Sequence, residues 1–416
     1  MGVSHNKAGS RDRVAERRVV TRELSVPRPR TPWMLGPVNV RLEGVRARLV
    51  SDDAAFLKYA KAHLAPIHDE EPSERPDIEA VLRWHEGMPP KDRSAQDPGL
   101  LAMSRLDRDL YAAEGRLAWF RIDELPALHL RFAWDGQRLR IEGDFYFHLS
   151  ARALPDRLRR VFYHRRLEDL RSRRFTTLLS YLVYYPCFWW LERHRDLHPI
   201  HAAGVQLRLG DTTGVVVLAG PSGIGKSTLV SALGAEPDAS FLSDSFLLHC
   251  RNIVRPVPEP LLLDQWSRAW AGADTLLTEV AHRFCLGRKG FHWRADRRGK
   301  GGPMQLLLFP QRSVTESVRP VSASYARGRL RSGDLIVNDL RRYWAFAAVL
   351  ELFDPHPLVS VREQHLASLV ESVPIYEIGL TPDATRTRVL AVVRGLLEAG
   401  LPVAAAPAST GTGAYR

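Results

Sequence analysis

The feature that constrains this chain most is a glycine-rich turn at residues 220–227, set between an apolar stretch and a helical pattern. Residues 215–219 (VVVLA) predict a buried strand, and the pattern after Lys226 predicts a helix. The turn matches G-x-x-x-x-G-K-[ST], the Walker A or P-loop pattern that holds nucleotide phosphates. Because strand, loop and helix follow in the order that this motif requires, we interpret the turn as an ATP or GTP site and not as a chance match.

Each residue type in the turn has its own predicted role. Gly220, Gly223 and Gly225 allow positive φ angles and bring backbone N–H groups close to phosphate oxygens. The following helix directs its positive end at the same anion. Lys226 is expected to contact the β and γ phosphates, and the Ser227 hydroxyl is expected to bind Mg²⁺. The predicted nucleotide-binding residues are Gly220, Pro221, Ser222, Gly223, Ile224, Gly225, Lys226, Ser227 and Thr228.

Composition narrows the class of protein. The length of 416 residues predicts two domains with tails. The formal net charge is +12, but the arginines are spread along the chain, so we expect no nucleic-acid partner. No apolar run is long enough to span a membrane. The three cysteines lack C-x-x-C spacing, which argues against a disulfide framework or a zinc site and favours a reducing cytoplasm: Cys187, Cys250 and Cys285.

Changes of pattern along the chain predict five segments. Residues 1–32 predict a disordered basic arm, and residues 33–152 a small α+β domain. Residues 153–197 predict a basic and aromatic helical connector. Residues 198–403 predict the nucleotide-binding domain, and residues 404–416 a disordered tail.

Local patterns predict elements of the first domain. Residues 38–42 alternate apolar and polar side chains, which predicts a half-buried strand. Residues 51–53 offer an N-cap for a helix. The acidic, proline-containing residues 68–98 are expected to be loop-rich. Asp135-Gly136 between two apolar segments predicts a hairpin.

The connector combines arginines with aromatic residues. Residues 154–174 predict a helix with a charged outer face, and phosphate or nucleic-acid binding is the alternative role for its arginines. Residues 175–191 predict an aromatic helix that is broken near Pro186. We expect aromatics at this density to pack in a core and not to stack on bases.

The nucleotide-binding domain continues with alternating strands and helices. Residues 240–249 predict a strand interrupted by Asp244, and residues 304–309 and 373–380 predict two more strands. Residues 385–399 predict a closing helix. This pattern predicts an α/β fold in which the loop lies at the end of a buried strand.

Three short segments together resemble one known family. They are residues 201–203 (HAA), the glycine-rich turn, and residues 242–244 (LSD). Over roughly residues 175–400 the chain resembles the HPr kinase-related proteins, which are similar in fold to phosphoenolpyruvate carboxykinase. The resemblance implies an α/β P-loop domain of the HPr kinase type, preceded here by a smaller α+β N-terminal domain.

The resemblance also implies an activity. It implies an ATP-dependent kinase with Mg²⁺, in which Asp244 is the general base and also touches the metal, and in which His201 lies near the phosphates. The acceptor would be a hydroxyl of a peptide, a protein or a small molecule. A second signature segment of HPr kinases is missing, so HPr itself is not the expected acceptor. Members of the group are often oligomeric, which leaves a homo-oligomer open.

Several residues keep two interpretations. A core histidine is the alternative for His201, and a cap or turn residue is the alternative for Asp244. Glu259 is a candidate second metal or substrate contact, or a loop carboxylate among prolines. Residues 283–303 predict a basic loop whose cations, from Arg288 to Lys300, either clamp phosphates or lie in solvent.

Three functions compete. The first is the kinase. The second is a non-catalytic or regulatory ATP/GTP-binding module, and it stays open because Ser245 stands where the family usually carries a second Asp. The third is a transporter or motor ATPase. The chain lacks an LSGGQ-like signature and an apolar strand that ends in Asp-Glu, which argues against the third function.

Overall fold

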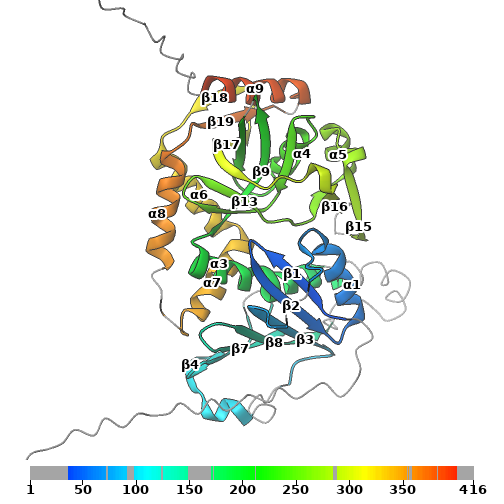
Figure 1. The fold of residues 1–416 in the computed structure, drawn as a ribbon, viewed down its shortest axis with the longest axis vertical. Helices are drawn as coiled ribbons and strands as arrows, with labels where there is room; N and C mark the ends of the chain where they lie inside the picture. The colour runs from blue at the N-terminus through cyan, green and yellow to red at the C-terminus, as the bar shows by residue number, and fades with distance from the viewer. Residues whose placement is uncertain are drawn as a thin grey trace, which may run out of the picture. The chain divides into compact units, whose positions relative to one another are not determined.

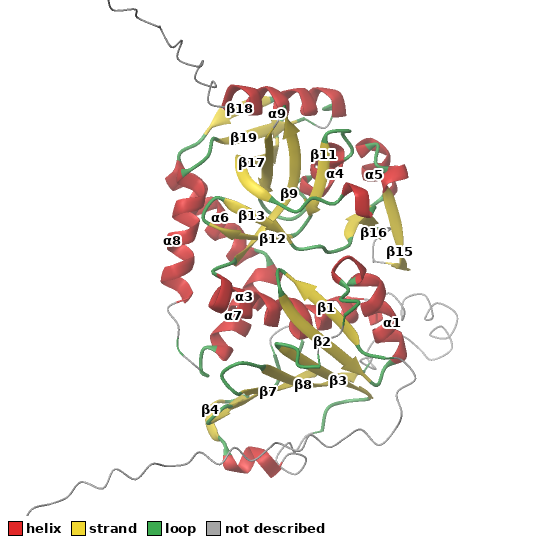
Figure 2. Ribbon diagram, in the orientation of Figure 1, coloured by secondary structure: helices red, strands yellow, loops and turns green. Residues whose placement is uncertain are grey.

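The computed structural model describes residues 36–71, 74–90, 98–122, 125–148, 170–171, 173–210, 212–283, 288–353, 355, 358–381 and 383–400. The predicted arm at residues 1–32, the tail at 404–416 and most of the basic helix at 154–174 lie outside the described residues. The described chain has a mixed α/β fold with two large mixed sheets and one small sheet (Figures 1 and 2).

The first sheet is formed by eight strands from the N-terminal part of the described chain. Strands β2, β3 and β8 run parallel to one another, and the other neighbours in the sheet are antiparallel. In spatial order the strands are β1 (Val38–Leu42), β2 (Val45–Ser51), β3 (Ile78–Glu86), β8 (Leu139–Phe147), β7 (Leu128–Trp134), β6 (Arg116–Trp119), β5 (Leu110–Ala113) and β4 (Ser104–Asp107).

Three local predictions in this part of the chain are confirmed. Asp53 caps helix α1 (Ala54–His63), because its side chain accepts a hydrogen bond from the Phe56 N–H at 2.6 Å. The hairpin between β7 and β8 turns at Asp135-Gly136, where Gly136 has a φ of 91°. The predicted strand at residues 38–42 coincides with β1.

The predicted loop at residues 68–98 is wrong in its middle, where β3 forms an inner strand of the sheet. Ile78, Ala80 and Leu82 are buried, and the residues between them are half-buried. This alternation of period two is the pattern of a strand with one fully covered face. Acidic and proline-containing neighbours on both sides concealed the pattern in the sequence.

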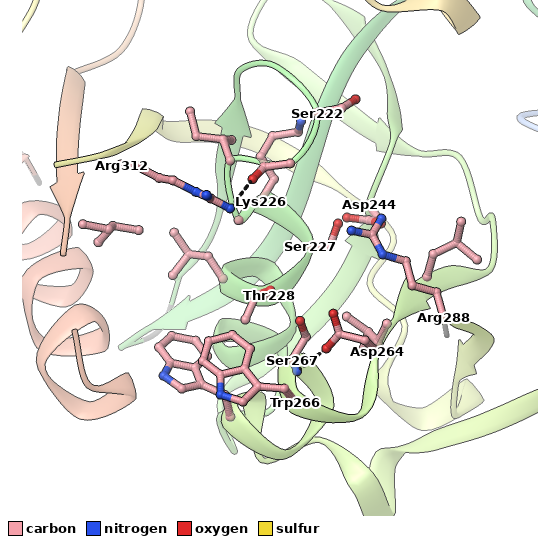
Figure 3. Close-up of a pocket in the computed structure, with 18 of the residues that line it drawn as sticks. Ser222, Lys226, Ser227, Thr228, Asp244, Asp264, Trp266, Ser267, Arg288 and Arg312 are labelled. Carbon is pink, nitrogen blue, oxygen red and sulfur yellow. Dashed lines mark hydrogen bonds between the residues drawn. The ribbon is translucent and has the colours of Figure 1, made fainter. Parts of the chain in front are cut away.

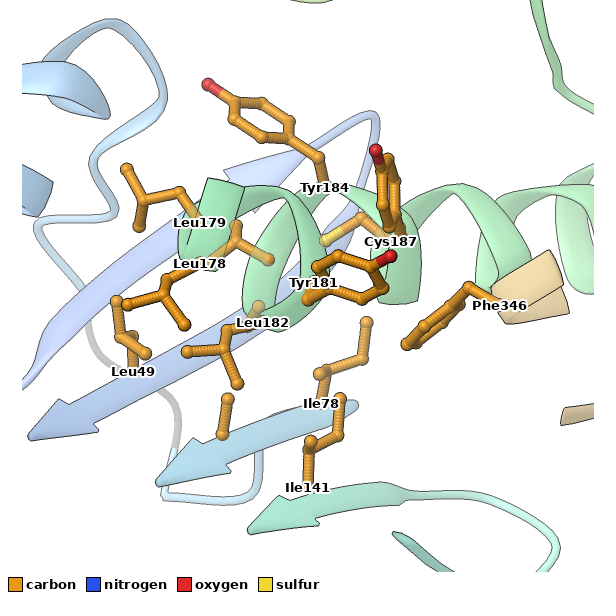
Figure 4. Close-up of a cluster of buried hydrophobic side chains, with 14 of the residues drawn as sticks. Leu49, Ile78, Ile141, Leu178, Leu179, Tyr181, Leu182, Tyr184, Cys187 and Phe346 are labelled. Atoms are coloured by element: carbon orange, nitrogen blue, oxygen red, sulfur yellow. The ribbon is translucent and has the colours of Figure 1, made fainter. Parts of the chain in front are cut away.

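An aromatic helix packs on this sheet. Figure 4 shows Tyr181 and Leu182 directed toward the sheet residues Ile78 and Ile141. The predicted break near Pro186 is wrong, because the chain stays helical through a π-helical turn (Ser180–Tyr184) into α3 (Tyr185–Arg195). A proline has no N–H for the helical ladder, and the wider turn just before it accommodates that loss. The expected role of the aromatics in the core is confirmed by these buried residues: Tyr181, Tyr184, Tyr185, Phe188 and Trp189.

The second sheet carries the glycine-rich turn. Strand β10 pairs with β9 in an antiparallel manner and with β17 in a parallel manner, so it is an inner strand. The strands are β10 (Thr212–Ala219), β9 (His198–Leu209), β12 (Phe246–Cys250), β13 (Ile253–Pro256), β17 (Gly302–Arg312), β19 (Ile375–Leu380) and β18 (Ser317–Pro320), with β11 (Ala239–Ser243) paired to β9.

A three-stranded sheet corrects the prediction for residues 283–303. That segment was expected to be a loop, but β16 (Lys289–Trp293) lies between β14 (Leu261–Leu263) and β15 (Leu277–Arg283). Phe291 and Trp293 are buried on one face of β16, which explains why this basic segment forms a strand.

Among the described residues, six α-helices follow β10 along the chain. They are α4 (Lys226–Gly234), α5 (Gln265–Ala271), α6 (Ala323–Ile336), α7 (Asn338–Leu350), α8 (Leu358–Glu371) and α9 (Arg386–Gly400). Of these, α7 packs on α3 in the core of the first sheet. Short helical turns lie at Ala65–Ile67, Pro98–Ala102, Asp274–Leu276 and Ala295–Arg297. Within the described ranges, every helix is too short or too polar to cross a membrane. The predicted strands at 240–249, 304–309 and 373–380 and the predicted closing helix are confirmed by β11 and β12, β17, β19 and α9.

Candidate functional site

The glycine-rich turn leaves the end of β10 and enters α4 at Lys226. Gly220, Gly223 and Gly225 have φ angles of 145°, 82° and 102°, so the predicted positive φ values are confirmed. These angles are strained for residues with a Cβ, which explains the three glycines. Gly225 caps α4 and brings no side chain, so the N–H groups of the first helical turn are left for an anion.

The turn forms one wall of a cavity of about 660 Å³ (Figure 3). The other walls come from the β11–β12 link, α5, the end of β17, the start of α7, and the β19–α9 link. The charged side chains that line the cavity are Lys226, Arg288, Arg312, Asp244, Asp264 and Asp339. A cavity lined by both cations and carboxylates suits a ligand that carries both phosphates and a metal ion.

The ammonium group of Lys226 is buried, and three protein acceptors surround it. Its Nζ donates to the carbonyl oxygens of Gly220 at 2.7 Å and Pro221 at 3.1 Å. The third contact is Nε2 of His201 at 3.3 Å. An ammonium group has three N–H donors, so its capacity is filled within the protein. Burial lowers the pKa of Lys226, and the negative charge of Asp244 acts in the opposite direction.

His201 lies beside both strands that lead to the site. It pairs with Phe246 at the start of β12, and its neighbour Ala202 pairs with Ala219 at the end of β10. Burial and the nearby Lys226 lower the pKa of His201 to about 3. The imidazole is therefore neutral near pH 7, and its Nε2 accepts a hydrogen bond from the Lys226 ammonium group. The sheet thus brings the predicted histidine to the predicted lysine.

Asp244 lies in the link between β11 and β12, at the cavity wall, with 8% of its surface exposed. Figure 3 shows its carboxylate beside the Ser227 hydroxyl and the Arg288 guanidinium. Burial raises its pKa to about 6, although Ser227, Lys226 and Arg288 each act to lower it. Among the described residues, no hydrogen-bond partner reaches its Oδ1. A buried carboxylate oxygen without a partner is costly in the free protein, and a bound ligand would satisfy it.

Two further carboxylates lie near Asp244. Asp339, at the start of α7, lines the same cavity. Glu259 is not among the residues that line the cavity, but burial and the charges of Asp339 and Asp244 raise its pKa well above its usual value. The structure therefore brings Glu259 into the electrostatic surroundings of the site without placing it on the cavity wall.

Members of the basic segment from Arg288 to Lys300 differ in role, and Arg297 fits neither prediction, because it donates to the carbonyl oxygens of Gly234, Glu236 and Pro237. Arg288 lines the cavity, as a phosphate clamp would. Lys289 pairs with Glu279 at 2.9 Å, and Arg294 pairs with Asp296 at 3.0 Å, both at exposed positions. The solvated interpretation therefore fits Lys289 and Arg294, whereas Arg288 belongs to the site.

Sequence reasoning missed several residues of the cavity. Arg312 at the end of β17 donates from Nη2 to the Gly223 carbonyl at 3.1 Å and so contacts the glycine-rich turn directly. Asp264 caps α5 by accepting from the Ser267 N–H at 2.6 Å. The sequence signal for Arg312 was its place just after a predicted strand, where sheets of this class bind ligands. For Asp339 no such signal existed, because the region between the strands β17 and β19 had no predicted elements.

One side of the cavity is apolar. Trp266 and Trp270 on α5 stack with ring centroids 6.4 Å apart and an interplanar angle of 22°. Trp266 is 66% exposed, which is unusual for so large an apolar side chain next to a cavity. The β19–α9 side contributes Leu380, Ala384 and Val389. Such a wall suits a flat, aromatic part of a ligand.

No family model matches this chain, and a search of curated proteins found no match. The resemblance to HPr kinase-related proteins therefore stays a prediction from three short segments.

Proposed function

We propose that this chain binds ATP with Mg²⁺ at the glycine-rich turn and transfers the γ-phosphoryl group to a hydroxyl. The acceptor would be a peptide, a protein or a small molecule, and the fold would be a P-loop domain of the HPr kinase type. The observation that carries the proposal is the unpartnered Oδ1 of Asp244, buried beside Ser227 in a cavity that Lys226 also lines. A reducing cytoplasm is the compartment that the cysteine content favours.

The phosphate side of the proposed site has four sources of positive potential. Lys226 and the first turn of α4 lie at the glycine-rich turn, and Arg288, just before β16, and Arg312, at the end of β17, line the cavity. Guanidinium groups and helix N-termini both favour phosphate oxygens. The apolar wall around Trp266 would then receive the nucleobase, because Thr228, which follows Ser227 in the motif, lines the same part of the cavity in Figure 3.

The donor atoms of the cavity fit Mg²⁺. The Ser227 hydroxyl and the Asp244 carboxylate are hard oxygen ligands, which Mg²⁺ prefers, and Oδ1 of Asp244 has a lone pair that no described residue uses. When bound, the ion would neutralise phosphate charge. Asp339 brings a further carboxylate to the cavity, whereas Ser245 offers none.

Asp244 would act on the acceptor hydroxyl. With a pKa of about 6 it is mostly ionised at pH 7, yet it is basic enough to accept a proton. The acceptor oxygen forms a bond to the γ-phosphorus while the bond to the β–γ bridging oxygen breaks. The hydroxyl proton moves to Asp244, and ADP leaves with the electron pair of the broken bond.

A regulatory nucleotide-binding module is the second candidate, and the contacts of Lys226 favour it. Lys226 is bonded to Gly220 and Pro221 of its own turn. A nucleotide must displace at least one of these contacts, so binding would rearrange the turn. Such a rearrangement could order a surface for a partner without any transfer.

Incubation with γ-labelled ATP and Mg²⁺ tests the proposal and separates the two candidates. A panel of serine-containing peptides, a cell extract and small polyols serves as the acceptor set. We expect label in at least one acceptor, and no label when Lys226→Ala replaces the wild type. Lys289→Ala, which removes an exposed lysine outside the cavity, is the matched control and should transfer normally. ATP binding without transfer to any acceptor would favour the regulatory module.

A further inference from the structure

A second group of chemically reactive side chains lies at the end of β12 opposite to Asp244. Asp196, Cys250 and His365 each offer a ligand atom, and these atoms lie within 4.8 Å of one another. Asp196 caps the end of α3, Cys250 ends β12, and His365 lies on α8. The three residues are far apart in sequence, so only the fold brings them together.

The distances in this cluster approach those of a metal site. Oδ1 of Asp196 lies 2.9 Å from Nε2 of His365 and 3.1 Å from Nε2 of His198, and Sγ of Cys250 lies 3.5 Å from Oδ2 of Asp196. With metal–nitrogen and metal–sulfur bonds of about 2.0–2.3 Å, the ligand atoms of a tetrahedral site are separated by roughly 3.3–3.7 Å. Small side-chain rotations would therefore place Asp196, Cys250 and His365 around one ion. His198 is not in that group of three, but its Nε2 lies against Asp196, so it is the nearest fourth ligand.

The surroundings of His198 support this geometry. Its Nδ1 lies 3.1 Å from Oε1 of Glu192, which is fully buried and held by Arg362 and Tyr343. A carboxylate that receives the second N–H of a histidine fixes the ring and directs the other nitrogen at a metal. Glu192 therefore faces Nδ1 of His198, and Asp196 faces Nε2. In a metal site, Glu192 would orient the ring, and Asp196 would bind the ion together with His198.

A buried histidine with one unpartnered ring nitrogen lies beside this cluster. His249 pairs with His198 across β12 and β9 and is 1% exposed. Its Nδ1 has no hydrogen-bond partner among the described residues, and the same is true of Nδ1 of His365. The ring centroids of His249 and His198 are 6.0 Å apart. The histidines near Asp196 therefore include two ring nitrogens, Nδ1 of His249 and Nδ1 of His365, whose hydrogen-bonding capacity no described residue uses.

We propose that Asp196, His198, Cys250 and His365 bind one Zn²⁺ ion. A thiolate and two imidazoles select a borderline-soft metal such as zinc over Mg²⁺ or Ca²⁺, which prefer oxygen ligands. Four protein ligands fill a tetrahedral shell, so the ion would be structural. It would join the end of α3 to β9, β12 and α8.

This position gives the ion a connection to the nucleotide site. Strand β12 begins directly after Asp244 and Ser245 and ends at Cys250. A metal that fixes the Cys250 end would limit the movement of the strand that positions Asp244. No local sequence pattern indicates this site, because the expected signature was C-x-x-C spacing and these ligands come from four separate elements.

Metal analysis of the full-length protein, freed of any polyhistidine tag and dialysed against zinc and then against buffer, tests the proposal. We expect about one zinc per chain. Cys250→Ser and His365→Ala should each weaken zinc binding by roughly tenfold or more in competition with a chromophoric chelator. His68→Ala, at an exposed position away from the cluster, and Asp244→Asn, in the other cavity, should keep wild-type zinc affinity.

Cobalt provides a second readout that needs no variant to fold. Replacement of zinc by Co²⁺ in the wild-type protein should give a thiolate-to-cobalt charge-transfer band and the strong visible bands of a tetrahedral ion. Zinc content well below one per chain after reconstitution would overturn the proposal. Wild-type affinity in folded Cys250→Ser, or a cobalt spectrum without thiolate bands, would overturn it as well.

Discussion

Nζ of Lys226 lies 3.3 Å from Nε2 of His201, and both side chains are buried in the wall of the cavity. The neutral imidazole is one of the three acceptors that hold the lysine. A nucleotide that draws Lys226 to its phosphates must replace some of these contacts. His201, which lies on β9, therefore contacts the lysine that must move when a nucleotide binds.

Removal of the Lys226 charge tests the phosphate side of the cavity. Lys226→Ala should weaken ATP binding at least about tenfold, which corresponds to about 1.4 kcal/mol. The variant lacks the ammonium charge that is expected to contact the β and γ phosphates. Isothermal titration with Mg²⁺ and ATP measures the change. A folded variant with wild-type affinity would contradict the nucleotide site. Lys289→Ala serves as the surface control.

The His201 contact predicts a stability effect that depends on the acceptor atom. His201→Leu leaves a buried Lys226 donor without its acceptor and should destabilise the nucleotide-free protein by about 1–3 kcal/mol. His201→Gln keeps an acceptor and should cost less. Chemical denaturation of both variants gives the comparison. Equal losses in the two variants would show that packing, and not the hydrogen bond, is what His201 contributes.

Burial of Asp244 predicts a dependence of stability on pH. The folded protein holds the carboxyl proton until about pH 6, whereas the unfolded chain releases it near the ordinary value of 3.8. This group therefore destabilises the folded state increasingly as pH rises through that window, and its effect is constant above it. Asp244→Asn removes the effect, so its gain in unfolding free energy should be small at pH 4 and on the order of 1–3 kcal/mol at pH 7.

Urea denaturation of the wild type and Asp244→Asn at both pH values measures this difference. Asp296→Asn, an exposed carboxylate paired with Arg294, is the matched control and should show no such trend. A difference between wild type and Asp244→Asn that does not change with pH would show that the pKa of Asp244 is not raised. Addition of Mg²⁺ and ATP should reduce the gain, because the proposed ligand favours the ionised form.

The exposed Trp266 predicts selectivity for the nucleobase. Trp266→Ala should weaken ATP binding roughly tenfold, since stacking of a base on an aromatic ring contributes about 1–3 kcal/mol. Inorganic tripolyphosphate has no base, so its affinity should be unchanged in the same variant, and Trp266→Phe should retain most of the ATP affinity. Equal weakening of both ligands would place the base elsewhere.

The elements around the glycine-rich turn could be predicted from sequence because their signals are local. The valines of β10, the three glycines and the start of α4 follow one another in the sequence. Asp244 lies in the short link between β11 and β12, so it interrupts a single local pattern. The prediction of β3 failed because a nine-residue alternation lay between acidic and proline-containing stretches. The basic composition of β16 concealed a strand in the same way.

The rest of the site depends on contacts that no local pattern reports. His201 meets Lys226 because β9 pairs with both β10 and β12, and that pairing is a property of the sheet. Asp339 reaches the cavity from α7, far along the chain from the turn. The Asp196 and Cys250 cluster likewise joins a helix end to a strand end. Short motifs predicted residues that the structure places around one cavity, and the fold adds neighbours that those motifs do not contain.

The most direct test of the proposed mechanism compares the turnover of ATP by the wild type and by Asp244→Asn at saturating ATP and Mg²⁺, with ATP affinity measured in parallel. Asparagine keeps the size of the side chain but cannot accept the hydroxyl proton. We predict that the variant binds ATP within a few-fold of the wild type and releases or transfers the γ-phosphoryl group roughly a hundredfold more slowly, the scale of losing a general base. Turnover within a few-fold of the wild type would contradict the assignment of Asp244 as the base and the phosphotransferase mechanism built on it.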